Sequence, residues 1–345
     1  MKGNFLKNIL GVDSMRDVSC YFGDTTAPAD AEVVIISVPW SVTSDFGRGA
    51  TYTPDAIIDV SLGKELYDVA SGMSIEGRIA TAEIDYNIQE SSEQLGRDAE
   101  RAMRSHIEMG VGDYAAHKVA NVNEGFSAMH ESVYQQTKYW SLLGKRIAVV
   151  GGDHSVAFGA VKALSENNDG MGVLFIDAHA DFCREEEPFN FSHRTIARDI
   201  AESIPSVAKL VQVGVRDVDR AEVEQLTAND RVEVFYAEQL MAKRFEGSCW
   251  GDLCREIVAK LPQKVYVSLD IDALKIEFCN NTTAPTPGGM TFDEVVYMVN
   301  MVVESGREIV GFDISEVVSS LDDKMDAIVG ARLLAKLSVA MLRSK

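Results

Sequence analysis

The sequence predicts a three-layer α/β/α fold around a mainly parallel β-sheet, and two observations support this prediction. Short apolar runs rich in Val and Ile recur along the chain, nearly continuous in their apolarity. Strands that are buried on both faces of a parallel sheet have this pattern. Longer amphipathic segments lie between the runs, and such alternation indicates βαβ units with helices on both faces of one sheet.

The expected elements follow one another in a regular order. Strands are predicted at 33–40, 79–85, 146–152, 172–179, 210–217, 232–237, 265–272 and 309–316. Helices are predicted at 120–143, 155–166, 192–203, 219–227, 249–260, 291–305 and 325–343. We find no internal repeat, low-complexity tract or Pro/Gly/Ser-rich linker, so residues 31–345 are expected to form a single domain, preceded by an N-terminal arm at 1–30.

Composition excludes several classes of partner. The formal net charge of -20 argues against binding to nucleic acid or to an anionic membrane, because like charges repel. No apolar stretch approaches the roughly 18 residues of a membrane-spanning helix, and the first residues do not resemble a signal peptide. The five cysteines are scattered without a close C-x-x-C pair, which predicts free thiols in a reducing, cytoplasmic compartment.

Acidic and imidazole side chains gather where four of the predicted strands end. Gly151-Gly152-Asp153-His154-Ser155 follows one strand, and Asp177-Ala178-His179-Ala180-Asp181 follows another. Asp270-Ile271-Asp272 ends a third strand, and Glu316 ends a fourth. Open parallel sheets place their ligand sites at these carboxyl ends.

Buried carboxylates repel one another, so a group that converges at a sheet edge needs positive charge to compensate it. Two divalent ions would balance four carboxylates; the six predicted ligands are His154, Asp177, His179, Asp181, Asp270 and Asp272. Mixed imidazole and carboxylate ligands suit Mn²⁺, with Ni²⁺, Co²⁺, Fe²⁺ and Zn²⁺ as competitors. Each motif alone has a structural explanation, as a helix cap, a turn or a core histidine, and only their combination predicts a metal site.

The three motifs GGDHS, DAHAD and SLDID resemble the metal-ligand signatures of the arginase/agmatinase/formimidoylglutamase (ureohydrolase) family. The resemblance continues through residues 38–58, 191–200, 284–295 and 311–317, in the order that the family has. It implies an arginase-like α/β fold and a hydrolase that cleaves a C–N bond of a small guanidino or amidino compound. It also implies a homo-oligomer, a trimer or a hexamer.

The resemblance implies roles for individual residues. The six ligands would hold two metal ions, and a hydroxide bridging the ions would attack the central carbon of the substrate. Asp181 would orient this nucleophile, and Asp181 or His193 would deliver the proton to the leaving amine. Glu316 would bind the guanidinium by a charge-assisted hydrogen bond.

Some positions depart from the family pattern, and they leave the substrate open. Lys275-Ile276 replaces the usual Asp-Pro, Arg194 replaces a Gly, and Asn281–Pro285 replaces a Gly-Thr-Gly-Thr-Pro stretch. The loops 41–53 and 182–192 are expected to recognise the substrate tail. Glu185, Glu186 and Glu187 would suit an amine, as in agmatine, whereas Arg184 or Arg194 would suit a carboxylate, as in formimidoylglutamate or a guanidino acid; guanidine itself also remains open.

Two rival functions remain at this stage. A related deacetylase would use one metal ion, and the complete set of six ligands argues against it. A catalytically silent arginase-like protein that acts as a binding partner would be expected to lack metal ligands, and none is missing in this sequence.

Overall fold

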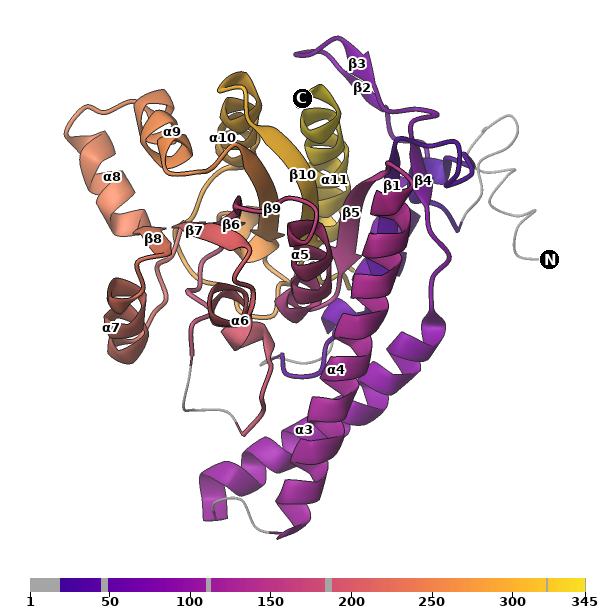
Figure 1. The fold of residues 1–345 in the computed structure, drawn as a ribbon, viewed down its shortest axis with the longest axis vertical. Helices are drawn as coiled ribbons and strands as arrows, with labels where there is room; N and C mark the ends of the chain where they lie inside the picture. The colour runs from indigo at the N-terminus through magenta and orange to yellow at the C-terminus, as the bar shows by residue number, and fades with distance from the viewer. Residues whose placement is uncertain (1–18, 45–48, 110–112, 184–187, 321, 345) are drawn as a thin grey trace.

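The computed structural model describes residues 19–44, 49–109, 113–183, 188–320 and 322–344. In these residues, eight parallel strands form one sheet in the order β4-β1-β5-β10-β9-β6-β7-β8 (Figure 1). The strands are β1 (Val33–Val38), β4 (Ile79–Thr81), β5 (Arg146–Gly151), β6 (Met171–Ile176), β7 (Val207–Val213), β8 (Val232–Phe235), β9 (Lys264–Asp270) and β10 (Glu308–Ser315).

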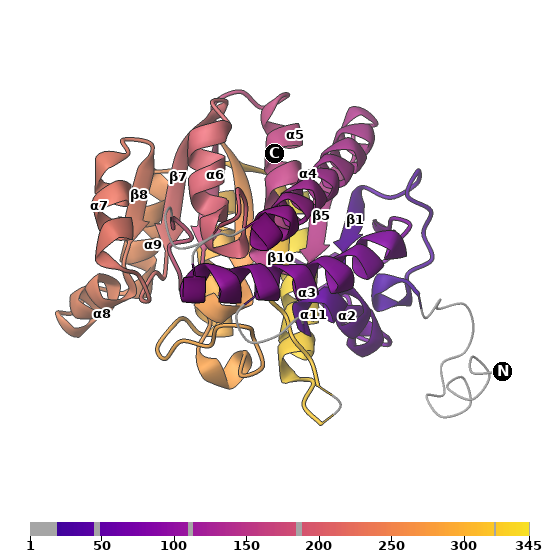
Figure 2. The same ribbon diagram turned by 90° about the horizontal axis from the view of Figure 1, so that it is seen from below.

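Helices cover both faces of this sheet, which confirms the predicted three-layer architecture (Figures 1 and 2). One apolar core joins the sheet to α2 (Thr53–Ser61), α8 (Ala237–Phe245), α9 (Trp250–Ala259), α10 (Phe292–Glu304) and α11 (Met325–Arg343). The other core joins it to α3 (Tyr86–Met109), α4 (Asp113–Leu142), α5 (Ala157–Ser165), α6 (Ile196–Ser203) and α7 (Arg220–Ala228). Successive side chains of a strand point to opposite faces, so the continuous apolar runs supply both cores at once.

The order of the central strands matters most for the site. The last strand, β10, lies between β5 and β9, and β6 lies beside β9. The four strands whose ends carry the predicted site residues are therefore neighbours in the middle of the sheet. Short 3-10 turns continue several chain segments near the site: η2 (Gly49–Tyr52), η3 (His154–Val156), η4 (His193–Thr195), η5 (Ile271–Ala273) and η6 (Ile276–Phe278).

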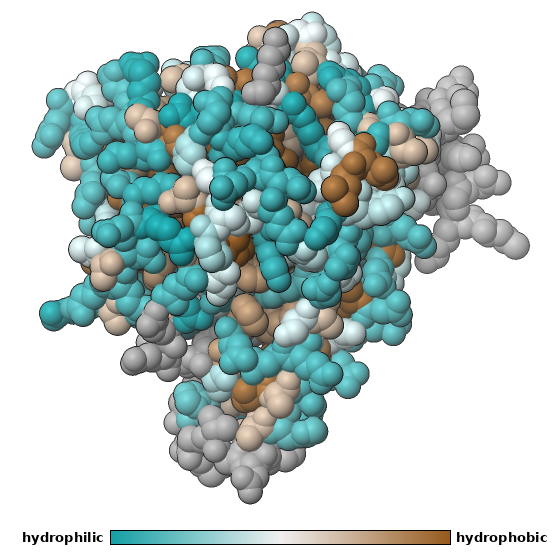
Figure 3. Space-filling model, in the orientation of Figure 1, coloured by the Kyte–Doolittle hydropathy of each residue, from teal (hydrophilic) through white to brown (hydrophobic). Residues whose placement is uncertain are grey.

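The structure contains elements that the sequence analysis did not predict. Helix α3 was missed, and α4 begins seven residues before the predicted start at 120. The two helices form an antiparallel hairpin that projects from the body of the molecule (Figure 1). Helix α8 and the small hairpin of β2 (Tyr67–Asp68) and β3 (Met73–Ser74) were also missed. The surface seen in Figure 3 is largely hydrophilic, as the excess of acidic residues leads one to expect.

Part of the predicted N-terminal arm lies outside the described residues, which begin at 19. The remaining part contains η1 (Tyr21–Gly23), where Tyr21 and Phe22 are buried in the core beside α2. The division into an arm at 1–30 and one domain at 31–345 stays a prediction.

Candidate metal centre

The predicted ligands come together at the carboxyl ends of the four central strands. His154 follows β5, Asp177 and His179 follow β6, and Asp270 ends β9 with Asp272 just beyond it. Glu316 follows β10, between the ends of β5 and β9. We call these six ligand candidates and Glu316 the floor of the site: His154, Asp177, His179, Asp181, Asp270, Asp272 and Glu316.

The turn that carries His154 depends on a close approach between two strand ends. Gly152 donates its backbone N–H to the carbonyl of Val38 at 2.9 Å, and Asp153 donates to the carbonyl of Trp40 at 2.7 Å. A Cβ atom on Gly152 would lie 1.7 Å from the Trp40 carbonyl oxygen, so only glycine fits there. The Asp153 carboxylate then caps the η3 turn by accepting from the Ser155 backbone at 3.1 Å.

His154 forms a compact group with carboxylates from two neighbouring strands. Its Nδ1 lies 2.9 Å from Asp177 Oδ2, 3.3 Å from Asp181 Oδ2 and 3.5 Å from Asp270 Oδ2. Ligand atoms of His154, Asp177 and Asp181 all lie within 4.8 Å of one another. One cation could therefore be shared among them.

A second group lies beside the first and shares Asp177 with it. His179 Nδ1 is 2.9 Å from Asp272 Oδ2 and 3.5 Å from Asp177 Oδ1. Ligand atoms of Asp177, His179 and Asp272 also lie within 4.8 Å of one another. The side chain of His179 is 24 % exposed, whereas that of His154 is 1 % exposed, so the second group is the one nearer to solvent.

The electrostatics of the floor fit a pair of divalent cations. Burial and the neighbouring charges of Asp272, Asp177 and Glu316 raise the pKa of Asp270 well above its usual range. Burial and the charge of Asp177 raise the pKa of Asp181 to about 8.

The imidazoles respond in the opposite direction. Although burial lowers it, the charge of Asp272 and contacts with Asp177 raise the pKa of His179 to about 12. Carboxylates that resist ionisation and imidazoles that hold protons both indicate excess negative charge. A donor set of two imidazoles and four carboxylates matches what Mn²⁺ and related divalent ions bind.

Strained backbone marks two of the predicted site residues. Asp181 has φ 50° and Glu316 has φ 59°, in the left-handed region that non-glycine residues seldom occupy. Only Phe22 shares this property among the other non-glycine residues that the structure describes. Strain of this kind collects at functional sites, where surrounding contacts hold it in place.

Glu316 is buried and held by hydrogen bonds at both carboxylate oxygens. The His154 backbone N–H donates to Oε1 at 3.1 Å, and the Thr283 hydroxyl donates to Oε2. Thr282 donates its hydroxyl to the Glu316 carbonyl at 2.9 Å. Both threonines belong to the stretch that departs from the family pattern, so this stretch still supports Glu316. Glu316 itself does not line the cavity described below.

His193 lies in the loop before α6, at the start of η4, and is paired with a residue of the loop after β1. Its Nδ1 is 3.0 Å from Thr43 Oγ1, and its backbone N–H donates to the same oxygen at 3.2 Å. Ser192 donates its backbone N–H to Thr195 Oγ1 at 3.0 Å, and Thr195 donates its backbone N–H to the Ser192 carbonyl at 3.3 Å, which fixes this turn. Thr43 is thus a supporting residue that the sequence analysis did not single out within the loop 41–53.

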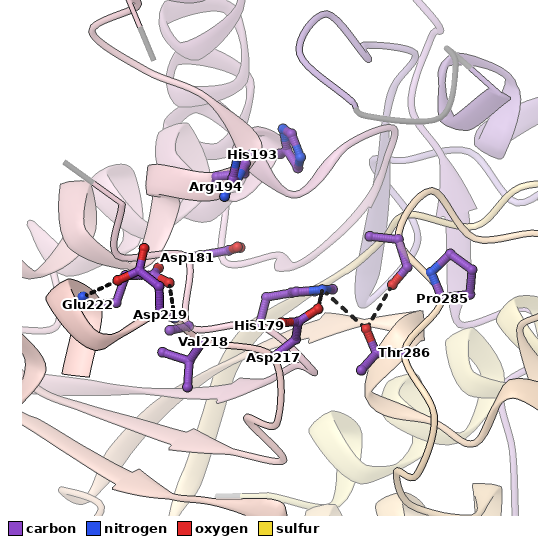
Figure 4. Close-up of a pocket in the computed structure, with 12 residues that line it drawn as sticks. His179, Asp181, His193, Arg194, Asp217, Val218, Asp219, Glu222, Pro285 and Thr286 are labelled. Carbon is purple, nitrogen blue, oxygen red and sulfur yellow. Dashed lines mark hydrogen bonds and ion pairs between the residues drawn. The ribbon is translucent and has the colours of Figure 1, made fainter. Parts of the chain in front are cut away.

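A cavity of about 350 Å³ opens onto the floor through His179 and Asp181 (Figure 4). Its other lining residues come mainly from loops, and we call them the rim: His193, Arg194, Asp217, Val218, Asp219, Glu222 and the segment 284–286. The size is within the range of small-molecule sites. Figure 4 shows His193 and Arg194 on one side of the cavity and Thr286 on another.

The acidic residues of the rim were missed at the sequence level. Asp217 and Asp219 follow β7 and are exposed, whereas Glu222 is buried. Asp219 and Glu222 form a capping box at the start of α7, and Glu222 also accepts from the Phe182 backbone N–H at 3.0 Å. The signal was available, because Asp217 ends the predicted strand at 210–217.

The expected tail loop 182–192 lies partly within the described residues. Arg184, Glu185, Glu186 and Glu187 lie outside the described residues. Arg194 is half-buried and lines the cavity. Ala284 and Pro285 of the departing stretch line the same cavity. Lys275 is half-buried, Ile276 is exposed, and neither lines the cavity.

Two general features complete the description. All five cysteines are free thiols. Within the described ranges, no helix combines the length and apolarity that crossing a bilayer requires.

Comparison with known proteins identifies the family. The chain is 29% identical to the N(1)-aminopropylagmatine ureohydrolase of Thermus thermophilus over 297 residues, which are 86% of each protein. It is 26% identical to the agmatinase of Pyrococcus horikoshii over 306 residues, 88% of this chain and 90% of that protein. The fold matches the solved structure of proclavaminate amidino hydrolase from Streptomyces clavuligerus with a TM-score of 0.71 at 22% identity, over 94% of this chain and 97% of that one.

A family model described as the arginase family matches residues 31–339. The match confirms the predicted arginase-like fold and the predicted enzyme class, a hydrolase of the ureohydrolase type. The chain belongs to the arginase family.

Proposed function

We propose that this protein hydrolyses a small guanidino compound with a cationic tail, in the manner of an agmatinase or an N(1)-aminopropylagmatine ureohydrolase. The observation that supports it most directly is the floor, where two imidazoles and four carboxylates converge below a cavity with an acidic rim. The names of the relatives from Thermus thermophilus and Pyrococcus horikoshii point to the same substrates.

Two divalent ions are proposed to occupy the floor, with Mn²⁺ as the first candidate and Ni²⁺, Co²⁺, Fe²⁺ and Zn²⁺ as alternatives. Asp177 belongs to both groups of donors, which favours a pair of ions over the single ion of a deacetylase. When bound, the ions would supply Lewis acidity and lower the pKa of coordinated water.

The chain's own residues would bind and orient the substrate and move its protons. The charge of Glu316 interacts with the charges of Asp270 and Asp272. Glu316 is proposed to attract the positively charged guanidinium of the substrate. Asp181 lines the cavity, and its carboxylate is proposed to accept a proton from the attacking water and to pass it to the leaving amine. His193 lines the cavity on the other side and is proposed to exchange protons with solvent.

The rim is proposed to select the tail. Asp217, Asp219 and Glu222 give one wall of the cavity three carboxylates, which suits a protonated amine. Arg194 lines the same cavity and supports a second candidate, a substrate with a carboxylate tail such as formimidoylglutamate.

A substrate panel tests the proposal. Protein loaded with Mn²⁺, and in parallel with Ni²⁺, Co²⁺ or Zn²⁺, is offered agmatine, N(1)-aminopropylagmatine, arginine, guanidinobutyrate, formimidoylglutamate and guanidine, and urea, ammonia and formamide are measured. We expect kcat/KM to be highest for the substrates with amine tails. Highest turnover of formimidoylglutamate would favour the second candidate, and failure of the protein to bind metal would contradict the proposal.

Location and assembly remain proposals as well. Five free thiols agree with a reducing compartment, and we propose that the protein is cytoplasmic. A trimer or a hexamer is proposed from the family resemblance, and sedimentation equilibrium of the full chain tests it. Absence of binding to nucleic acid or membranes stays a prediction from the charge.

A further inference from the structure

A second polar group is buried behind His154, on the side of its ring that faces away from the metal ligands. It consists of Tyr266 and Ser268 on β9 and Asp313 on β10, and all three are 0 % exposed. Ser268 and Asp313 are direct partners in the pairing of the two strands. Tyr266 lies two residues before Ser268, so both side chains point to the same face of the sheet.

The ring of His154 lies between this group and the carboxylates of the floor. Its Nδ1 faces Asp177, Asp181 and Asp270, as described above. Its Nε2 is 2.9 Å from Ser268 Oγ and 3.9 Å from Asp313 Oδ2. Phe175 stacks on the ring with a centroid distance of 4.4 Å and an interplanar angle of 19°, which keeps the two edges pointing in these directions.

Asp313 is unusual because its buried charge has no close ion pair in the part of the chain that the structure describes: the His154 ring lies 3.9 Å away, and Ser268 and Tyr266 are its nearest polar neighbours. Among the described residues, neither of its carboxylate oxygens has a hydrogen-bond partner within normal geometry, and the same is true of the Tyr266 hydroxyl. An unpaired carboxylate in a protein interior costs several kcal/mol. A group of this kind therefore needs an explanation in terms of what the protein binds or holds.

We infer that Asp313 is a positioning residue, which acts through Ser268 to hold His154 in the tautomer that offers Nδ1 to a cation. This inference rests on the proposed metal centre. A cation at Nδ1 requires that nitrogen to be unprotonated, so the ring proton must be on Nε2. The Nε2–H then donates to Ser268 Oγ, and the Ser268 hydroxyl is left to donate to the Asp313 carboxylate.

This arrangement would explain why a charged group is buried at Asp313. A negative charge two groups behind the ring polarises the Nε2–H bond and makes Nδ1 a stronger donor to a cation. Tyr266 lies near enough to Asp313 for burial and this charge to raise the pKa of the phenol well above its usual range. The phenol thus stays protonated beside the carboxylate.

Asp313→Asn tests the inference because it keeps the side-chain volume and removes the charge. We expect the affinity for one of two Mn²⁺ ions, measured by isothermal titration calorimetry, to fall by about 10- to 100-fold, the usual effect of removing an outer partner of a ligating histidine. The electron paramagnetic resonance spectrum at two Mn²⁺ per chain should change from that of a coupled pair toward that of isolated ions. The Tm of the metal-free protein should not fall, because the substitution removes an unpaired charge.

Two further variants separate this role from a purely structural one. Ser268→Ala interrupts the connection and leaves the carboxylate in place, so it should weaken the same Mn²⁺ site; this variant decides the question if Asp313→Asn does not fold. Asp68→Asn is the control: Asp68 is also a buried carboxylate, but it is hydrogen-bonded to Ser71 and paired with Lys336 at the β2–β3 hairpin. It should lower the Tm and leave both Mn²⁺ affinities unchanged.

The outcomes are distinct. Unchanged Mn²⁺ affinities in both Asp313→Asn and Ser268→Ala, or a lower metal-free Tm without any loss of affinity, would overturn the inference. If the wild-type protein binds no Mn²⁺, the proposed function fails first and the inference fails with it. If the wild type binds two ions and the variants bind them equally well, only the inference fails.

Discussion

The floor and the rim of the site are built in different ways. The floor comes from the ends of neighbouring strands and from the turns directly after them, and most of its side chains are almost completely buried and in contact with one another. The rim comes from loops, and the side chain of Asp217 on it is 70 % exposed. Geometry that a sheet fixes suits chemistry that tolerates little displacement, whereas loops can change without disturbing the sheet. The difference supports our proposal that the floor carries out the reaction and that the rim selects the substrate.

The largest expected effect follows from removing a charge in the floor. Asp181→Asn should lower kcat by about 10²- to 10⁴-fold, because it removes a group proposed to transfer protons. It also removes a ligand candidate, so metal content is measured together with the rate on agmatine under saturating Mn²⁺. Wild-type turnover in this variant would contradict both roles of Asp181.

A somewhat smaller effect is expected at His193, because this proposed proton-transfer residue lies on a loop. His193→Asn should lower kcat by roughly 10²-fold, at the low end of what general acid–base catalysis contributes. Thr43→Val, which keeps the histidine and removes its hydroxyl partner, should cost less. If both variants turned over agmatine at the wild-type rate, His193 would line the cavity but would not take part in proton transfer.

A buried histidine beneath the floor, His130, should make the free energy of unfolding of the protein depend on pH. His130 on α4 donates from Nε2 to the Ser155 carbonyl at 3.0 Å, next to His154. Burial lowers the pKa of His130 from 6.5 to about 4. Between these pH values the unfolded chain binds a proton that the folded protein does not, so stability falls as the pH falls.

The size of this effect can be measured by urea unfolding. The free energy of unfolding should decrease by about 2 kcal/mol from pH 7 to pH 5 through His130 alone. His130→Gln removes the titrating group, and its free energy of unfolding should change less over the same interval. Equal pH dependence of the two proteins would show that His130 is not buried as a neutral group.

The smallest effect is expected for a single charge on the rim. Asp217→Asn repeats the chemical change of Asp181→Asn at an exposed position. It should raise KM for agmatine by up to about fivefold, since an exposed ion pair contributes at most about 1 kcal/mol, and leave kcat nearly unchanged. A large loss of kcat would contradict the proposal that the rim binds the substrate tail and that the floor carries out the reaction.

The floor could be predicted from the sequence better than the rim. All eight strands of the sheet and the residues at four strand ends were predicted, because buried parallel strands have a continuous apolar pattern and ligand motifs follow them. The order of the strands was not predicted, since an apolar run does not specify which strands lie beside it in the sheet. The position of β10 between β5 and β9 is therefore information from the structure.

Residues on loops were predicted least well. Asp219 and Glu222 also act as helix caps, and a carboxylate at a helix start has an ordinary structural explanation in a sequence. Helix α3 was missed because its exposed surface is polar and few apolar residues mark its buried side. Asp313 lies in the segment 311–317 that carries part of the family resemblance, but no role was predicted for it, because it is a single charge inside an apolar strand.

The central position of β10 also has a consequence for how the protein is made. Residues 308–315 leave the ribosome after the other seven strands of the sheet, yet they join β5 to β9 across the middle of the sheet. Before β10 emerges, β5 and β9 lack their common neighbour, so any sheet that forms has unpaired edges there, and such edges invite aggregation. The strands on each side of β10 carry some of the ligand residues, and neither side carries all of them. A chain released early would thus contain every predicted metal ligand and still lack the strand that brings them together.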